Sequence, residues 1–185
     1  RFPGRKLQVG MHAYGGAYTR APLKAVPDDN VVISVVACFF LQKATRVGRR
    51  GVSCDVYRKY FSDWAKITRN LIWRPNAGNW AGWHAGLPDI EITQTMKDFR
   101  FVAEQGCIGI YFDTVWEHWA TQAPQYYVMA QLAWDPWQNG QVMLEDYYRR
   151  GFGPASADLK GYWTLLEATR TELLKMGLTR LDMPK

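Results

Sequence analysis

The stretch Gly106-Cys-Ile-Gly-Ile-Tyr-Phe-Asp113-Thr-Val-Trp-Glu117-His-Trp-Ala-Thr-Gln122 decides the fold that the sequence predicts. Its first part, residues 107–112, is a short apolar run behind a glycine, which is typical of a strand buried on both faces of a parallel sheet. An acid, Asp113, stands where the apolar run ends. A second acid, Glu117, follows four residues later, between tryptophans and next to a histidine. The stretch therefore predicts a strand that carries carboxylates and flat aromatic rings at its carboxyl end.

These residue types suit chemistry on a sugar. Carboxylates can move protons at an acetal oxygen, and tryptophan faces can stack on the apolar faces of pyranose rings. The alternative is structural: Asp113 would cap the next helix, and the aromatic rings would close the end of a core.

Outward from this stretch, apolar runs and helical periodicity alternate along the chain. The predicted strands are 7–14, 31–38, 70–74 and 107–113. The predicted helices are 56–67, a helix from Thr93 or Thr95 to a C-cap at Gly106, one with Pro124 in its first turn that runs to about Trp134, 142–150 and 156–176. Their predicted buried faces are Tyr57, Tyr60, Phe61, Trp64 and Ile67; Met96, Phe99, Val102 and Ala103; and Leu159, Tyr162, Trp163, Leu166, Thr169 and Leu173.

This alternation indicates an α/β fold with a parallel sheet covered by helices. Four strands are half of a (β/α)8 barrel, whose full form needs about 250 residues. A small open doubly wound sheet is the other option. No glycine-rich phosphate loop follows any predicted strand, which disfavours a nucleotide-binding version.

Composition narrows the possible partners. The chain has 185 residues, of which 48% are hydrophobic, and a net charge of +6. A basic cluster at Lys43, Arg46, Arg49 and Arg50 either meets an anionic ligand or forms a solvated loop. It lacks any nucleic-acid motif, so we expect no nucleic-acid partner. No apolar run reaches the roughly 18 residues of a membrane span.

Cysteine and histidine usage argues against metals and cofactors. The three cysteines are widely spaced, with no Cys-x-x-Cys pair. The separations of His12, His84 and His118 match no compact metal motif, so we expect neither a metal nor another cofactor. The chain starts without an initiator Met or a signal peptide, and we expect a mature product or part of a longer protein.

Several short motifs follow one another along the chain. They are Trp73-Arg-Pro-Asn76, Asp98-Phe-Arg-Phe101, Gly109-Ile-Tyr-Phe-Asp113, Glu117-His-Trp-Ala-Thr-Gln122, Tyr126-Tyr127, Leu132-Ala-Trp-Asp-Pro136 and Asp146-Tyr-Tyr-Arg-Arg-Gly-Phe-Gly-Pro-Ala155. Together they resemble the domain-of-unknown-function 4838 family, bacterial proteins that look like glycoside hydrolases of the α-glucuronidase and hexosaminidase barrel type.

The resemblance implies a domain organisation and a location. Residues 1–135 would be the C-terminal half of a (β/α)8 glycosidase-like barrel, and residues 136–185 would be trailing helices packed on it. The partner would be the N-terminal half of the same barrel, and the protein would be secreted or periplasmic. The sequence departs from the family pattern at two acids: many members read Trp-Asp-Tyr where this chain has Trp73-Arg74-Pro75, and a Glu where it has Ala37.

In such a barrel the strand ends would converge on one mouth. The catalytic candidates there are Asp113 and Glu117, and the substrate-binding candidates are His12, Tyr14, Arg74, Asn76, Trp80, His84, Trp116, His118 and Trp119. Asp113 would act as a base or nucleophile, or hold a sugar hydroxyl. Glu117 would be a general acid whose pKa is raised by the neighbouring tryptophans, or else a surface acid paired with a cation.

The other candidates also keep two interpretations. Arg74 would clamp a carboxylate or sulfate of an acidic sugar, or form a structural ion pair. The tryptophans would form subsites or core contacts. The predicted function is a glycoside hydrolase that cleaves a poly- or oligosaccharide, with an acidic one as an option. The alternatives are a non-catalytic glycan-binding barrel and a structural fragment that needs an N-terminal half.

Overall fold

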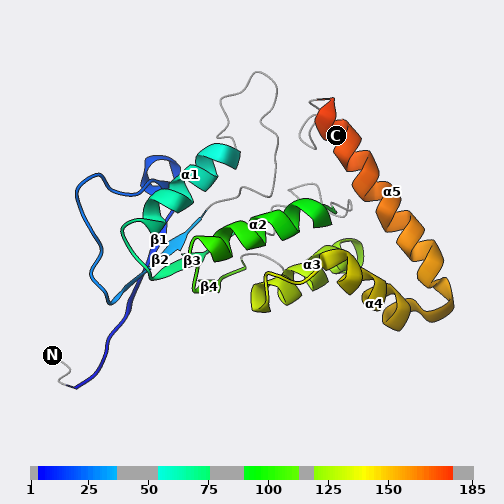
Figure 1. The fold of residues 1–185 in the computed structure, drawn as a ribbon, viewed down its shortest axis with the longest axis horizontal. Coiled ribbons are helices and arrows are strands. Elements are labelled where there is room, and N and C mark those ends of the chain that lie inside the picture. Colours follow the sequence, from blue (N-terminus) through cyan, green and yellow to red (C-terminus); the bar gives the residue numbers. More distant parts are fainter. Residues whose placement is uncertain (1–3, 37–53, 76–89, 113–118, 177–185) are drawn as a thin grey trace.

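The computed structural model of the chain describes residues 4–36, 54–75, 90–112 and 119–176 (Figure 1). Four short strands come first, with two helices between them, and three helices follow. The strands are β1 (Val9–Ala13), β2 (Val31–Val35), β3 (Leu71–Trp73) and β4 (Gly109–Ile110). The α-helices are α1 (Cys54–Ala65), α2 (Ile92–Glu104), α3 (Trp119–Trp134), α4 (Gly140–Phe152) and α5 (Ser156–Lys175), with short 3-10 turns at Gly16–Thr19 and Gly153–Ala155.

The strands form one parallel sheet in the order β1-β2-β3-β4, so each strand pairs with its neighbour in the sequence. A doubly wound sheet reverses its strand order at a switch point. The four described strands contain no such reversal. The fold is therefore α/β with a sequentially ordered parallel sheet, which agrees with half of a barrel and not with the doubly wound alternative.

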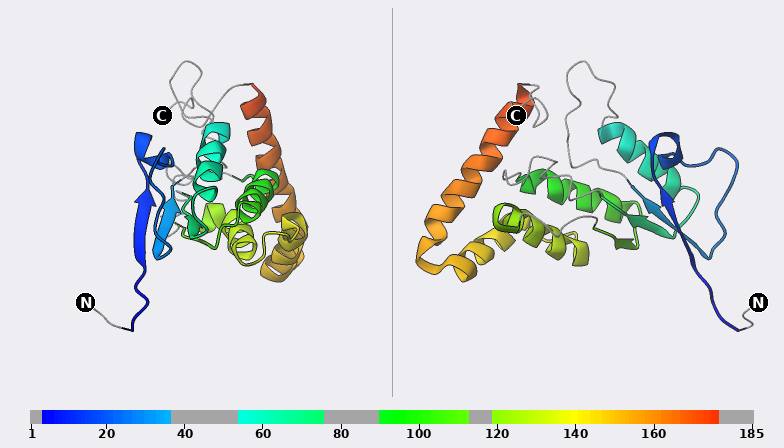
Figure 2. Two further views of the ribbon diagram at one scale, coloured as in Figure 1. Left: turned by 60° about the vertical axis from the view of Figure 1, so that its left-hand side comes forward. Right: turned by 180° about the vertical axis from the view of Figure 1, so that it is seen from behind.

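The helices cover one face of this sheet. In the left view of Figure 2, β1 and β2 lie on one side of the molecule and the described helices lie beyond them on the other. The alternating strand residues on the covered face belong to the core: Ala13, Ile33, Val35, Leu71 and Trp73 are each at most 1% exposed. They pack with Phe61 and Trp64 of α1 and Phe99 and Val102 of α2. Burying these side chains is the main favourable contribution to folding here.

The sequence places the strands well and the buried sides of the helices less completely. Each strand begins within two residues of its predicted start. In α1, Phe61 and Trp64 are buried as predicted, while Tyr57 and Tyr60 are only half-buried and Ile67 lies beyond the end of the helix. In α2, Phe99 and Val102 are buried, and Met96 and Ala103 are half-buried.

The predicted C-cap at Gly106 is confirmed. Its φ is 79°, a conformation that favours glycine. The Gly106 N–H donates to the Ala103 carbonyl at 2.9 Å, and the Cys107 N–H donates to the Val102 carbonyl at 3.1 Å. This pair of bonds is a Schellman motif, which ends α2 and turns the chain into β4.

Burial of β4 on both faces is a prediction that the structure overturns. Ile108 and Tyr111, which flank β4, are 61% and 51% exposed. Within the described sheet, no strand pairs with the outer edge of β4. An apolar run shows that a strand is mostly hydrophobic, but it does not show how many neighbours the strand has.

Two helix predictions also need correction. Pro124 is not in the first turn of its helix, because α3 begins five residues earlier, at Trp119. The proline cannot donate to the carbonyl of Ala120, but the helix is held by tertiary burial of Pro124, Val128 and Met129. In α5, Trp163 is buried and Leu159 and Leu166 are half-buried, whereas Tyr162 and Thr169 are exposed. The proposed boundary between residues 135 and 136 stays a prediction.

Candidate functional site

The second face of the sheet is the one that no described helix covers. Its side chains come from the strand positions that alternate with the core residues, among them Gly10, His12, Val32, Ser34 and Ile72. None of these five belongs to the hydrophobic core cluster. We call this surface the open face. It keeps small and apolar side chains accessible, as a sheet does when a further layer is meant to lie against it.

One row of side chains crosses the open face at the carboxyl ends of the strands. It consists of Tyr14, Arg74 and Tyr111, together with Val36, which is only 2% exposed; each lies one residue beyond the paired positions Ala13, Val35, Trp73 and Ile110. The ladder continues through this row, because the N–H groups of Val36, Arg74 and Tyr111 donate to the carbonyls of Ala13, Val35 and Trp73 at 3.0, 3.0 and 2.9 Å. We call these four residues the edge row.

Arg74 and Tyr111 contact each other within the edge row. The guanidinium carbon of Arg74 lies 5.3 Å from the centre of the Tyr111 ring, within the range of a cation–π contact. Because Trp73 points into the core, alternation turns Arg74 toward the open face. Such a contact helps to fix the position of the cation.

His12 and Tyr14 are on strand positions that face the same side of the sheet as Arg74. His12 pairs in register with Ser34, one row below the edge row, and both His12 and Tyr14 are exposed. Both are on β1, and Arg74 is two strands away. Three of the predicted binding residues, distant in sequence, are thus brought to one surface of the sheet.

Trp119 is not on the sheet. It is the first residue of α3, and its ring meets that of Tyr126 edge-on, with centroids 5.0 Å apart. The remaining candidates lie outside the described residues: Asn76, Trp80, His84, Asp113, Trp116, Glu117 and His118.

Tyr111 is a further candidate residue, which the sequence did not single out. It occupies the edge row beside Arg74 and is 51% exposed. The signal was available, because Tyr111 stands two residues before Asp113 and side chains two apart in a strand share a face. The sequence did not single out Tyr111 because the whole run 107–112 was predicted to be buried.

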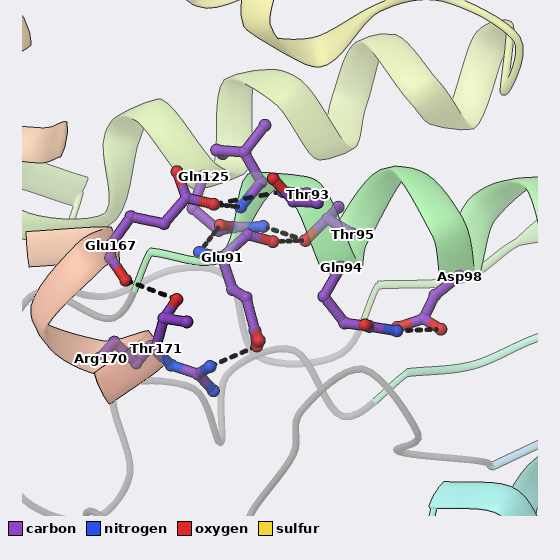
Figure 3. A network of polar contacts seen from close by, with 10 residues as sticks. Glu91, Thr93, Gln94, Thr95, Asp98, Gln125, Glu167, Arg170 and Thr171 are labelled. Carbon is purple, nitrogen blue, oxygen red and sulfur yellow. Dashed lines mark hydrogen bonds and ion pairs between the residues drawn. The ribbon is translucent and has the colours of Figure 1, made fainter. Parts of the chain in front are cut away.

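A polar junction holds the start of α2, which follows β3 and therefore begins at the same end of the sheet as the edge row (Figure 3). Glu167 of α5 accepts hydrogen bonds from the backbone N–H groups of Ile92 and Thr93 at 2.7 and 3.2 Å. Glu91, which precedes α2, makes no side-chain cap of its own and instead forms an ion pair with Arg170. A carboxylate from a distant helix therefore caps α2.

Gln125 of α3 completes this junction. Its Oε1 accepts from the Glu91 N–H at 2.9 Å, and its Nε2 donates to Oγ1 of Thr95 at 2.7 Å. The Thr95 hydroxyl donates to the Glu91 carbonyl at 2.6 Å. Gln125 and Thr95 are completely buried, so these bonds satisfy polar groups that would be costly to leave unpaired. The junction joins α2, α3 and α5 at the start of α2.

The most perturbed carboxylate of the described chain lies on the helix layer and not on the open face. Asp98 of α2 is completely buried and pairs with Arg58 of α1, and Gln94 donates to the same oxygen at 2.9 Å. Burial raises the pKa of Asp98 to about 6, although the Arg58 and Gln94 contacts act in the opposite direction. This pair joins the two helices that cover the sheet, so we assign Asp98 a structural role.

Within the described ranges, no group of three or more His, Cys, Asp or Glu side chains is gathered that could hold a metal ion. Burial raises the pKa of the Cys107 thiol, whose Sγ donates to the Gly109 carbonyl at 3.0 Å. Within the same ranges, no helix is both long and apolar enough to pass through a bilayer.

Comparison with known families gives one match. The profile of the domain of unknown function DUF4838 matches residues 2–164. The chain belongs to the DUF4838 family. The DUF4838 match covers all four strands and helices α1 to α4, and it ends within α5. The matched residues therefore include the edge row and the Arg58–Asp98 pair, and the match confirms the family that the motifs indicated. No curated protein and no solved structure matches the chain.

Proposed function

We propose that this chain is the C-terminal half of a (β/α)8 barrel that hydrolyses glycosidic bonds in a poly- or oligosaccharide. The sequential parallel order, the single helix-covered face and the uncovered second face support the barrel. In a closed barrel the second face lies inside and is filled by side chains from all the strands. Small residues such as Gly10, Ser34 and Gly109 would leave room for that packing.

The edge row is the observation that carries the functional proposal. In barrel enzymes the active site is built at the carboxyl ends of the strands. Here that end presents Tyr14, Arg74 and Tyr111 on one face, and Asp113 follows Tyr111 by two residues in the sequence. We propose Asp113 as the base or nucleophile and Glu117 as the general acid. Their carboxyl separation would set the outcome: about 5 Å for retention, and about 6.5–9.5 Å for inversion.

The test uses the full-length protein with Asp113→Asn and Glu117→Gln. Release of reducing sugar would be measured on a panel of polysaccharides and aryl glycosides. Each substitution should lower the rate by about 100-fold or more, the usual contribution of a positioned acid or base. Asp158→Asn, at an exposed position in the first turn of α5, is the matched control and should keep the parental rate. Unchanged rates in both carboxylate variants would eliminate the proposal.

A glycan-binding barrel without catalysis is the second candidate, and Arg74 is the observation that favours it. An arginine stays protonated and cannot serve as a base, yet it occupies the carboxyl end of β3, where barrel enzymes can carry an acid. Saturable binding of oligosaccharides without any sugar release would support this candidate over the enzyme.

The third candidate is a structural fragment that depends on an N-terminal half. The described sheet leaves β1 and β4 each with one unpaired edge, and Leu7, Val9 and Met11 around β1 are 51%, 53% and 44% exposed. Exposed edges and apolar side chains promote association. Residues 1–185 expressed alone should therefore self-associate, and a well-behaved monomer in light scattering would contradict that dependence.

A further inference from the structure

We propose that Trp134 and Trp137, at the turn between α3 and α4, form a second glycan-binding site that takes a neutral polysaccharide. We call these two residues the tryptophan pair. Trp134 ends α3, and Trp137 follows three residues later, before α4 begins at Gly140. The pair shares no residue with the edge row, so its binding can be measured whether or not the chain hydrolyses sugars. The motif Leu132-Ala-Trp-Asp-Pro136 is part of this turn, and the proposed function assigns it no role.

Both rings of the tryptophan pair are exposed to water. Trp134 is 91% exposed and Trp137 is 58% exposed. The tryptophans of α1, β3 and α5 are each at most 6% exposed, so the fold buries its large rings elsewhere. Within the described part of the chain, neither indole N–H of the pair has a hydrogen-bond partner. Each ring can therefore offer an apolar face and an N–H donor to a ligand.

Local hydrogen bonds fix the backbone between the two rings. The Asp135 carboxylate accepts from the Trp137 N–H at 3.0 Å, and the Asp135 carbonyl accepts from the Gln138 N–H at 3.4 Å. Asp at the first position and Pro at the second are favoured in such a turn, because Asp bonds back to the backbone and Pro fixes φ. A preorganised turn loses less conformational entropy when a ligand binds.

Both ends of the turn are anchored in the core. Leu132, two residues before Trp134, is completely buried. A Cβ at Gly140 would lie 3.0 Å from Ile92 of α2 and 3.1 Å from Val128 of α3, so the backbone packs directly against these side chains. Movement of the turn would disturb these contacts, and the core therefore sets the position of the tryptophan pair.

The segment that carries the pair is almost uncharged. Residues 119–144 contain one charged side chain, Asp135, although 22% of the whole chain is charged. The Asp135 carboxylate accepts a hydrogen bond within the turn itself. The segment offers no Lys or Arg to bind an anionic ligand, so it suits a ligand without charge.

Amide side chains near the pair supply polar groups for a sugar. Gln131, Gln138 and Gln141 are each within four residues of a tryptophan of the pair, and among the described residues their side chains have no hydrogen-bond partner. The side-chain oxygen of Asn139 caps α4 by accepting from the Gln141 N–H at 2.9 Å, which leaves its NH2 group as a donor. An amide both donates and accepts hydrogen bonds, as a sugar hydroxyl does.

The exposed area favours a glycan over a protein partner. A tryptophan side chain covers at most about 250 Å², so the two rings together expose roughly 400 Å² at most. A standard protein interface buries about 800 Å² on each partner. The tryptophan pair is by itself too small for a stable protein complex, and its size suits a ligand of one or two flat rings.

The experiment titrates neutral oligosaccharides into the full-length protein. Cellohexaose, xylohexaose and mannohexaose would be the probes in calorimetry, and chromatography after each titration would show whether the sugar was cleaved. We expect at least one of the three to bind. The affinity at this site should change by less than about twofold when salt is added, because no ion pair forms.

Variants locate the binding on the tryptophan pair. Trp134→Ala and Trp137→Ala should each remove one equivalent of bound sugar from the titration or weaken it by about tenfold or more, as at an interface hot spot. Trp134→Tyr keeps an aromatic ring and should retain part of the affinity. Tyr18→Ala, which removes a ring that is 81% exposed in the 3-10 turn Gly16–Thr19, is the matched control and should bind like the parental protein. Because the substituted rings are exposed, Tm should stay within about 3 °C of the parental value.

Two results would overturn the inference. One is failure of all three sugars to bind the parental protein; loss of parental self-association in the alanine variants would then identify the tryptophan pair as a protein interface. The other is sugar binding that both alanine variants leave unchanged, which would place the bound sugar elsewhere and leave the proposed function standing. Hydrolysis of aryl glycosides tests the proposed function separately from this site.

Discussion

Replacing Glu167 with alanine should destabilise a helix that is 75 residues away in the sequence. The Glu167 carboxylate on α5 accepts from the first two N–H groups of α2, those of Ile92 and Thr93. Glu91, the residue that would normally cap this helix, has no capping hydrogen bond. The alanine variant would therefore leave the Ile92 and Thr93 N–H groups uncapped. Gln125 accepts only from the Glu91 N–H in this junction.

The magnitude follows from two contributions. Loss of a side-chain cap costs about 1 kcal/mol, and removal of a negative charge from a helix N-terminus costs about 0.3–1 kcal/mol. The 2.7 Å bond to the Ile92 N–H is charge-assisted, which places the cost toward the upper part of these ranges. We expect Glu167→Ala to lower the free energy of unfolding by about 2 kcal/mol, or Tm by roughly 4–8 °C. Glu167→Gln keeps an acceptor oxygen and should cost about half as much.

Two measurements check this prediction. Urea denaturation gives the change in the free energy of unfolding, and native-state hydrogen exchange should show faster exchange at the Ile92 and Thr93 amides. Glu172→Ala is the matched control, because Glu172 is on the same helix, 65% exposed and paired with Lys175 at 2.7 Å. Its loss should change stability by less than about 0.5 kcal/mol.

Equal stability of the Glu167→Ala and Glu172→Ala variants would refute the capping role. So would unchanged exchange at Ile92 and Thr93, since the cap acts directly on those two amides. High salt should reduce the difference between Glu167→Ala and the parental protein, because part of the effect is electrostatic.

Three other predictions concern the core and the turns. Asp98 has a folded-state pKa of about 6 against about 3.9 unfolded, so the folded state binds the proton more tightly and this group lowers stability as pH rises from about 4 to 6. Asp98→Asn should remove that fall, worth up to about 3 kcal/mol, and a parental-minus-variant difference that is flat across this pH range would contradict it. Gly106→Ala should destabilise the protein by about 1 kcal/mol, because the φ of Gly106 is 79°. Gly161→Ala, inside α5 with open space around it, should stabilise the protein by about 0.5–1 kcal/mol. Thermal melts in which both variants shift Tm in the same direction would contradict this prediction. Phe99→Ala should lower the free energy of unfolding by about 3–5 kcal/mol in chemical denaturation. Phe99 is completely buried and meets Trp73 edge-on, with ring centroids 5.2 Å apart. A loss below about 1 kcal/mol would contradict tight packing around Phe99.

The sequence by itself determined the local elements and the class of the fold. Apolar runs located four strands, and a period near 3.6 located the helices, because both patterns record which side chains avoid water. Gly106 marked the end of α2 because few residues other than glycine adopt its backbone conformation at low cost. Ordered motifs indicated the family that the profile match confirms.

Only the tertiary structure decided which neighbours each element has. It shows that β4 is half exposed, that Pro124 lies inside a helix held by its packing, and that Tyr111 sits under Arg74. It also shows that the cap of α2 comes from Glu167 on α5. The physical reason is the same in each case: burial, capping and ring contacts depend on residues that are far apart in the chain. A periodic pattern shows which side of a segment avoids water. It does not show which other segment packs against that side.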